Sequence, residues 1–513
     1  GNVMKRQALQ VMIATILSKL LGFVREVALS YAYGASATTD AYLISQTIPV
    51  VVFSFISAGV ATAFIPNYSG ILNKNGRNQA DRYTSNLCNA LLLVASVLVA
   101  LIFLFTRPIV KVFASGFSGE MLLLTIKLTR VSVFGIYFTG IIGVFTAYLR
   151  LHGNFIVPAL ISLPMNLVII SSVFVSSKTN IYVLAAGGVI AAASQLIVCI
   201  LFSRLAGYQH KPIMDIKDEH LKAMVLMALP VIAGTAVSEV NVLIDRTLAS
   251  GIALGGISSL NYANRLTNFV RGLFVVSVTT VLYPLISRMA AEGKMVRLKG
   301  YLAEAISMVS IMVVPAAVGA MIFCREVVVL VFGRGAFTHE AIEMTSKALF
   351  YYSIGMIGFG LIEVLTRAFY SLRDTKTPVR CTVVVVLANI VLNILLSRVM
   401  GIPGLALATS ISGILGALVM SIYLRRRIGS FGLRTISLSF FKICIASLVM
   451  GLLARGSLTI ANQVLHRNVA LLVAIAVGAL TYGLLIFNMR IPEVDRTWVA
   501  VKQRLVGLTD KNN

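Results

Sequence analysis

Arginine and asparagine side chains recur in the middle of segments that are otherwise apolar. The predicted helix 257–287 is the clearest case, because at 100° per residue its polar residues fall within an arc of about 120°. These residues are Asn261, Asn264, Arg265, Asn268 and Arg271. An arginine at the centre of a membrane-spanning helix costs about 3 kcal/mol, so such a residue indicates function. Guanidinium groups form bidentate hydrogen bonds with phosphate, and the stripe therefore predicts a cavity for an anionic, phosphate-containing ligand.

The predicted helix 7–32 carries a second set of charges. Lys19 and Arg25 lie at a depth that matches the stripe, and Glu26 follows Arg25 directly. Asp40 lies near the start of the next predicted helix. We expect the positive charges of both segments to converge on one ligand, with these four residues among its contacts.

Internal ion pairing is the alternative interpretation of these charges. Arg25 would then pair with Asp40, and Arg271 with Glu239. For Arg265 and its neighbours a ligand-facing role is favoured, whereas for Asp40 structural pairing is favoured.

A weaker set of oxygen-bearing residues suits a metal ion. Ser238, Asn241 and Asp245 share one face of the predicted helix 222–250. Asn389 and Asn393 share a face of the predicted helix 379–399, and Thr409 lies in the predicted helix 402–425. Carboxylate, amide and hydroxyl oxygens without thiol or imidazole suit a hard cation such as Na⁺. Asparagine also forms hydrogen bonds between membrane helices, so spacing alone leaves both interpretations open.

Motifs of several enzyme classes are missing from the sequence. There is no GxxxxGK[ST] for nucleotide hydrolysis, no HExxH, no GxSxG and no acidic pair on an external loop. The five cysteines include no CxxC. We therefore expect a protein that is not an enzyme and that has no cofactor beyond a possible Na⁺ ion.

Long apolar helices must position these residues. Of the 513 residues, 58% are hydrophobic and 12% are charged, whereas soluble proteins carry about 25% charged residues. Uncharged runs such as 181–203 and 402–424 are long enough to cross a bilayer as helices and too long for barrel strands. We predict an all-α polytopic membrane protein with about fourteen transmembrane helices. They are 7–32, 38–66, 84–106, 120–149, 156–177, 181–204, 222–250, 257–287, 301–323, 341–370, 379–399, 402–425, 435–456 and 467–489.

The net charge of +25 is concentrated in alternate loops. Lysines and arginines cluster near residues 74–82, 204–217, 288–299, 373–380 and 425–434. This is the positive-inside pattern, and it places both termini and the basic loops in the cytoplasm. It argues against nucleic acid as a partner and for membrane lipids.

An internal duplication organises the chain. The segment 107–117 resembles 325–337, and Ala28-Leu-Ser30 resembles Leu248-Ala-Ser250, so equivalent positions lie 218 to 220 residues apart. Six predicted helices separate the copies, which gives both copies the same orientation. We predict two parallel six-helix lobes, 1–206 and 207–430, then two further helices in 431–490 and a cytoplasmic tail, 491–513. Parallel repeats around a midplane site are a transporter design.

Several of these segments resemble one known family, MurJ (MviN), of the MOP exporter superfamily. They are 18–26, 33–42, 63–66, 245–250, 261–266 and 367–378, and they follow the family order along nearly the whole chain. The resemblance implies the MOP fold, with two lobes around a central cavity and a groove for an undecaprenyl tail on the last two predicted helices, in 431–490. It also implies a flippase for lipid II in peptidoglycan and cell-wall biosynthesis, which affects cell shape.

The resemblance assigns roles to individual residues. Arg25 and Arg265 match cavity arginines that bind pyrophosphate, Lys19 stands where a third arginine is usual, and Glu26 replaces an aspartate. Asp40 matches an aspartate important for activity. The sodium site of some members corresponds to Asp245, Asn389, Asn393, Thr409 and the backbone of Leu405, with Asn393 replacing an aspartate.

Two departures from the family leave the cargo open. Phe53 replaces an arginine and Ala58 replaces a glutamate, while Arg271 would restore positive charge. The predicted function is a monomeric flippase that moves lipid II by alternating access. The alternatives are a flippase for another polyprenyl-linked glycan, such as teichoic acid, capsule or O-antigen, and, less favoured, a multidrug exporter. A membrane-embedded transferase and a non-transporting scaffold are further rivals.

Two outward connections, 33–39 and 251–258, are short and equivalent in the two copies. Their small residues allow close approach, so we predict that they form the periplasmic gate. Cysteines at Ser36 and Ser258 should then crosslink in the inward-open state.

Overall fold

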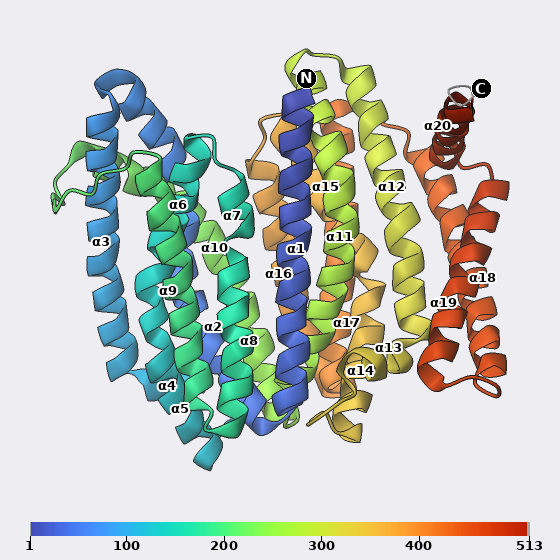
Figure 1. The fold of residues 1–513 in the computed structure, drawn as a ribbon, viewed down its shortest axis with the longest axis horizontal. Helices are drawn as coiled ribbons and strands as arrows, with labels where there is room; N and C mark the ends of the chain where they lie inside the picture. The colour runs from blue at the N-terminus through green and yellow to red at the C-terminus, as the bar shows by residue number, and fades with distance from the viewer. Residues whose placement is uncertain (1, 510–513) are drawn as a thin grey trace. The chain divides into compact units, whose positions relative to one another are not determined.

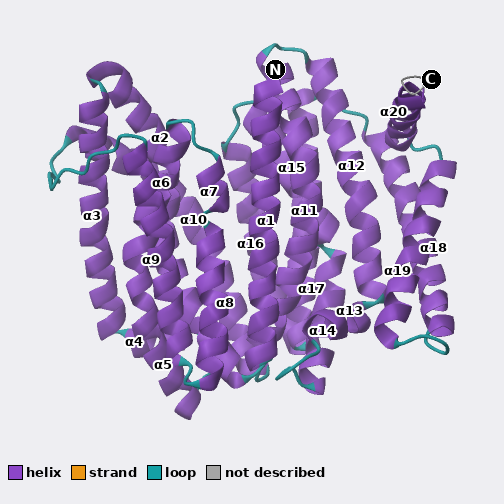
Figure 2. Cartoon of the chain, viewed as in Figure 1, coloured by secondary structure: helices purple, strands orange, loops and turns teal. Residues whose placement is uncertain are grey.

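The computed structural model describes residues 2–509, except the side chains of Ala61, Thr62 and Thr509, and the regular elements in this range are all helical (Figure 2). In chain order, the first helices are α1 (Asn2–Tyr33), α2 (Ala37–Asn75), α3 (Arg77–Leu104), α4 (Thr106–Phe113), α5 (Gly119–Ser132), the 3-10 turn η1 (Val133–Gly135), α6 (Ile136–Leu151), α7 (Ile156–Leu160), α8 (Ser162–Lys178) and α9 (Tyr182–Leu205). They are followed by α10 (Glu219–Ile252), α11 (Gly256–Ala291), α12 (Met295–Ile322), α13 (Cys324–Phe332), α14 (His339–Ile354), α15 (Met356–Ser371), α16 (Lys376–Met400), α17 (Ile402–Ile428), α18 (Leu433–Ala461), α19 (Arg467–Asn488) and α20 (Pro492–Thr509).

Membrane-spanning character follows from length and composition. Within the described residues, thirteen segments are long and apolar enough to cross a bilayer, and α5 to α6 and α7 to α8 each count as one of them. A fourteenth arises when α14 and α15, which are bent by 44° at their junction, are taken as one span. The predicted all-α polytopic fold with about fourteen transmembrane helices is confirmed.

The helix ends differ from the predicted ones. An apolar pattern locates only the part of a helix that crosses the membrane, and the helix can continue beyond it. The predicted loop between 66 and 84 is largely helical, since α2 and α3 continue past their apolar stretches. The short helices α4 and α13 and the terminal α20 were not predicted. Helix α20 lies in the predicted tail 491–513 and has an acidic first turn with Glu493 and Asp495, which favours a helix start.

The chain forms two compact units. The first holds the residues up to Arg265 together with Phe332–Met344 and Ile390–Leu405, and the second holds Leu266–Val331, Thr345–Asn389 and the residues from Ala406 onward. The predicted lobe boundaries at 206/207 and 430/431 stay a prediction.

Each unit has its own hydrophobic core. In the first, Tyr68, Tyr83 and Tyr148 are almost fully buried between α2, α3 and α6. In the second, α18 packs against α12 and α19, and the hydroxyl of Tyr482 donates a hydrogen bond to the carbonyl of Ile311 at 2.5 Å. This contact attaches the last two spans to α12.

The duplication appears in local structure as well as in sequence. The side-chain oxygen of Asn154 accepts from the backbone N–H of Val157 at 3.1 Å, and that of Asp374 accepts from the N–H of Thr377 at 3.0 Å. The two capping residues stand 220 positions apart. Each cap satisfies an otherwise unpaired donor at a helix start.

Candidate functional site

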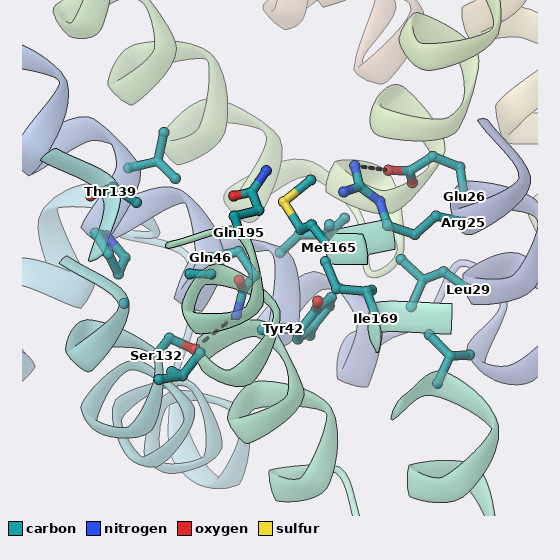
Figure 3. Close-up of a pocket in the computed structure, with 18 of the residues that line it drawn as sticks. Arg25, Glu26, Leu29, Tyr42, Gln46, Ser132, Thr139, Met165, Ile169 and Gln195 are labelled. Carbon is teal, nitrogen blue, oxygen red and sulfur yellow. Dashed lines mark hydrogen bonds and ion pairs between the residues drawn. The ribbon is translucent and has the colours of Figure 1, made fainter. Parts of the chain in front are cut away.

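A pocket of about 290 Å³, named the polar pocket for the charged and amide side chains that interrupt its mostly apolar lining, lies wholly within the first unit. Residues from α1, α2, α5, η1, α6, α8, α9 and the start of α11 line it, including Arg25, Glu26, Asn261 and Arg265. Figure 3 shows Arg25 and Glu26 at one end of the pocket. Both predicted cavity arginines therefore reach the same pocket, together with two of their predicted polar neighbours.

Glu26 organises the charged end of this pocket. Its carboxylate accepts a hydrogen bond from the Asn261 amide at 3.0 Å and lies 3.4 Å from the Arg25 guanidinium and 3.7 Å from Nε of Arg265. Arg25 also donates to the Asn166 side-chain oxygen at 3.0 Å. The acidic partner of Arg25 is thus Glu26 and not Asp40, as the ion-pairing alternative supposed.

The two arginines remain available to a ligand. Glu26 is only 5% exposed, whereas 54% of the Arg265 side chain and 21% of the Arg25 side chain are exposed. One buried carboxylate beside two partly exposed guanidinium groups leaves a net charge of +1. An anion that enters the pocket meets this positive charge and the free N–H groups of both arginines.

The opposite wall of the pocket carries neutral polar side chains. Gln46 donates to the hydroxyl of Ser132 at 2.8 Å, and Gln195 donates to the carbonyl of Ile161 at 3.2 Å. Thr139 lies on the same wall (Figure 3). These residues were not predicted as ligand contacts, although an amide in an otherwise apolar helix, as in α2 and α9, is the signal that could have identified them.

Asp40 has a different role from the cavity residues. It is 1% exposed, and its carboxylate accepts from the backbone N–H groups of Gly255 at 2.7 Å and Ser258 at 2.9 Å, and from the Ser258 hydroxyl at 2.5 Å. A carboxylate at a helix N-terminus pairs with free donors and with the helix dipole. Asp40, in the first turn of α2, therefore fastens α2 to the start of α11.

The two predicted gate connections touch each other at this point. A Cβ atom at Gly255 would lie 2.5 Å from the carbonyl oxygen of Ala35, and one at Gly34 would lie 2.5 Å from that of Ala336. Both glycines have positive φ, +79° and +66°, which other residues rarely adopt. The Tyr262 hydroxyl donates to the carbonyl of Gly34 at 2.9 Å, so small residues and backbone contacts hold the connections together.

The other predicted ligand contacts are not among the residues that line this pocket. Lys19 is exposed and does not line it, and Asn264 and Asn268 are partly buried on α11. Arg271 belongs to the second unit, where it lies 3.5 Å from Glu363 and over the ring of Phe359. Its acidic partner is therefore Glu363 and not Glu239.

Phe53, at the position of the expected arginine, is 2% exposed and packs against Gly140 in a core cluster with Ile136 and Val133. It adds no polar group to the pocket. An arginine there would place its stem among buried apolar side chains.

The candidate sodium ligands include buried oxygens that lack hydrogen bonds. Among the described residues, Oδ1 of Asn241, Asp245, Asn389 and Asn393 has no hydrogen-bond partner. Asp245, Asn393 and Leu405 belong to the first unit, and Asn389 and Thr409 to the second. Buried polar atoms in proteins normally have a hydrogen-bond partner. In each unit, taken by itself, these buried oxygens are therefore suited to bind a cation.

Comparison with known proteins places the chain in a family. A family model described as "Lipid II flippase MurJ" matches residues 29–476. The probable lipid II flippase MurJ of Thermotoga maritima is 29% identical over 499 residues, which cover 96% of this chain and 98% of that protein. The lipid II flippase MurJ of Thermosipho africanus is 30% identical over 440 residues, covering 85% of this chain and 88% of that protein.

Solved structures agree with the sequence relatives. A structure titled "Lipid II flippase MurJ, inward closed conformation" superposes with a TM-score of 0.81 at 27% identity, covering 93% of this chain and 98% of that one. An inward-facing multidrug resistance MATE transporter of the MOP superfamily reaches a TM-score of 0.65 at 16% identity, over 83% of this chain and 98% of that one, which shows a shared fold alone. The chain is a multi-pass membrane protein that belongs to the lipid II flippase MurJ family.

Proposed function

We propose that this protein is a flippase that moves lipid II, the undecaprenyl-pyrophosphate-linked peptidoglycan precursor, from the inner to the outer leaflet of the bacterial cytoplasmic membrane. The observation that carries the proposal is the pair of partly exposed arginines, Arg25 and Arg265, at one end of a polar pocket. Two guanidinium groups match the two phosphates of a pyrophosphate. The amide and hydroxyl groups of the opposite wall suit a saccharide.

The proposed mechanism is alternating access without covalent chemistry. The headgroup binds in the pocket while the polyprenyl tail stays in lipid, along the last two spans, α18 and α19. The protein acts as a monomer with both termini in the cytoplasm, where the basic loops lie. Contacts at Asp40 close the periplasmic side, and their release opens it.

Replacement of the two arginines tests the proposal. Arg25→Ala and Arg265→Ala should each abolish growth in a strain depleted of its own lipid II flippase, at normal expression. Arg150→Ala, which alters an exposed arginine outside the pocket, is the matched control and should support growth. Growth with both cavity arginines replaced would contradict the cavity as the headgroup site.

We further propose that Na⁺ binds at Asp245, Asn389, Asn393, Thr409 and the carbonyl of Leu405 and helps to reset the carrier. The buried oxygens of Asp245, Asn389 and Asn393 that lack hydrogen bonds support it. A cation that binds only the folded state raises the melting temperature by mass action. NaCl should therefore stabilise the protein more than choline chloride at equal ionic strength, and Asp245→Ala should remove the difference. Equal melting curves in the two salts would exclude the site.

A multidrug exporter is the less favoured candidate. An exporter of organic cations needs acidic and aromatic groups, whereas the charged end of this pocket has two arginines for one glutamate. Other polyprenyl-pyrophosphate glycans remain candidate cargoes, because the same two arginines would hold their phosphates.

A further inference from the structure

A second cavity, of about 340 Å³, lies in the first unit on α3, α6 and α9, which run side by side in Figure 1. Its walls are largely apolar, and the apolar side chains that line it include Leu92, Phe138, Ile141, Phe145, Leu196 and Ile200. None of its lining residues lines the polar pocket. The cavity is therefore a separate groove, formed on other faces of α6 and α9.

The length of the groove suits a lipid chain. Along α6 its lining runs from Tyr137 to Phe145, roughly 12 Å at 1.5 Å per residue. Half of the hydrocarbon core of a bilayer is about 15 Å thick. An acyl chain that starts at the membrane surface would thus follow the groove through most of one leaflet.

One end of the groove is polar. Arg204, at the end of α9, and His210, in the loop after it, both line the groove. Arg204 is exposed, and among the described residues it forms no ion pair with a carboxylate. Burial, and then the charge of Arg204, lower the pKa of His210.

The loop that carries His210 is firmly attached to α3. The hydroxyl of Tyr208 lies 2.9 Å from Nδ1 of His210 and 2.8 Å from the hydroxyl of Ser85, and Ser85 also accepts from the N–H of Lys211 at 3.0 Å. Asn89 donates to the carbonyl of Ile213 at 2.7 Å. With Nδ1 held by Tyr208, Nε2 of His210 is left for a ligand beside Arg204.

We propose that this groove binds an anionic phospholipid of the cytoplasmic leaflet, with one acyl chain between α3, α6 and α9 and its phosphate on Arg204 and His210. Charge complementarity favours this ligand. The Arg204 guanidinium, at the end of an apolar groove, can bind a phosphate whose hydrocarbon chain fills the groove. The basic loops place this end on the cytoplasmic side. The site is distinct from the cargo site and goes beyond the flippase function.

Native mass spectrometry of the purified protein tests the proposal, with phosphatidylglycerol and phosphatidylcholine of the same chain length as probes. Phosphatidylglycerol should be retained in preference to phosphatidylcholine. Arg204→Gln should lower phosphatidylglycerol retention about tenfold, the effect of losing one charge-assisted contact, and should leave phosphatidylcholine retention unchanged.

Two tryptophan variants on α9 separate the groove from the rest of the lipid-facing surface. Ile200→Trp fills the groove and should lower retention of both lipids. Leu201→Trp is the matched control, because Leu201 is the next residue, is 56% exposed and does not line the groove. Melting curves of each variant establish that it is folded. Wild-type retention of phosphatidylglycerol by Arg204→Gln, equal retention of the two lipids by the wild type, or equal behaviour of the two tryptophan variants would each overturn the proposal.

Discussion

Replacing Asp40 by asparagine should open the periplasmic side of the protein. In the structure Oδ2 of Asp40 accepts from the N–H of Gly255, and Oδ1 accepts from both the N–H and the hydroxyl of Ser258. Asparagine has one acceptor oxygen, so its NH₂ group must face one of these donors. The closed state then loses a charge-assisted hydrogen bond and the favourable interaction with the dipole of α11.

The expected magnitude follows from the burial of the contact. A hydrogen bond to a charged group contributes about 1.5–3 kcal/mol, and each 1.4 kcal/mol changes an equilibrium tenfold. Because Asp40 is 1% exposed, water replaces the lost contact only after opening. The open fraction should therefore rise about tenfold to a hundredfold.

A cysteine at Ser259 gives the readout. Ser259 is 0% exposed, and its hydroxyl has no hydrogen-bond partner among the described residues, so Ser259→Cys removes no contact of this kind. The five native cysteines are replaced first. A membrane-impermeant maleimide applied outside the cell then labels the new cysteine at a rate set by the open fraction.

The control is Asp218→Asn, which weakens the cap of α10 at His220 and should not change the labelling rate. If Asp40→Asn is labelled no faster than the wild type while its melting temperature is unchanged, Asp40 does not hold this side closed.

Three further predictions use other parts of the molecule. Gln195→Ala should weaken cargo binding several-fold, measured by retention of lipid II in native mass spectrometry, while loss of its hydrogen bond to the Ile161 carbonyl should lower the free energy of unfolding by only about 1 kcal/mol. Asp374→Ala should lower the free energy of unfolding by about 1 kcal/mol through loss of a helix cap. Partial burial would raise the pKa of Asp374, but hydrogen bonds, chiefly from Thr377, outweigh burial and lower this pKa below 3.8. The difference in free energy of unfolding between the variant and the wild type should therefore be present above pH 3.8 and should shrink as the pH falls further. Cysteines at Ser36 and Ser258 should crosslink and stop transport until a reductant is added, and transport at the normal rate by the crosslinked protein would contradict the gate.

Apolar runs and intramembrane charge made much of this architecture predictable. Runs of uncharged residues locate spans because lipid requires them, and Arg25 and Arg265 stand out because charge is rare in such runs. Both arginines line the same pocket. Local spacing thus identified residues that tertiary structure brings together from α1 and α11.

Contacts with the backbone could not be predicted in the same way. The partner of Asp40 is the start of α11, more than two hundred residues away, and backbone N–H groups have no signature in sequence. The alternative that paired Asp40 with Arg25 considered side chains only. Short helices such as α4 and α13 were missed because a few turns give too little apolar pattern to separate them from a loop.

Glu26 sets the net charge that the pocket has once a ligand is bound. It already neutralises one of the two arginines, so a pyrophosphate with two negative charges leaves the site with a net charge of −1 and feels repulsion from Glu26. Glu26→Gln keeps an acceptor for Asn261 and removes this repulsion. A gain of only about 1.4 kcal/mol would tighten binding about tenfold, and because release is slower, transport should be slower although the cargo is held more firmly. Retention of lipid II in native mass spectrometry and the rate of transport should therefore change in opposite directions. If both fall, Glu26 only holds the arginines in place, and its charge does not serve to release the cargo.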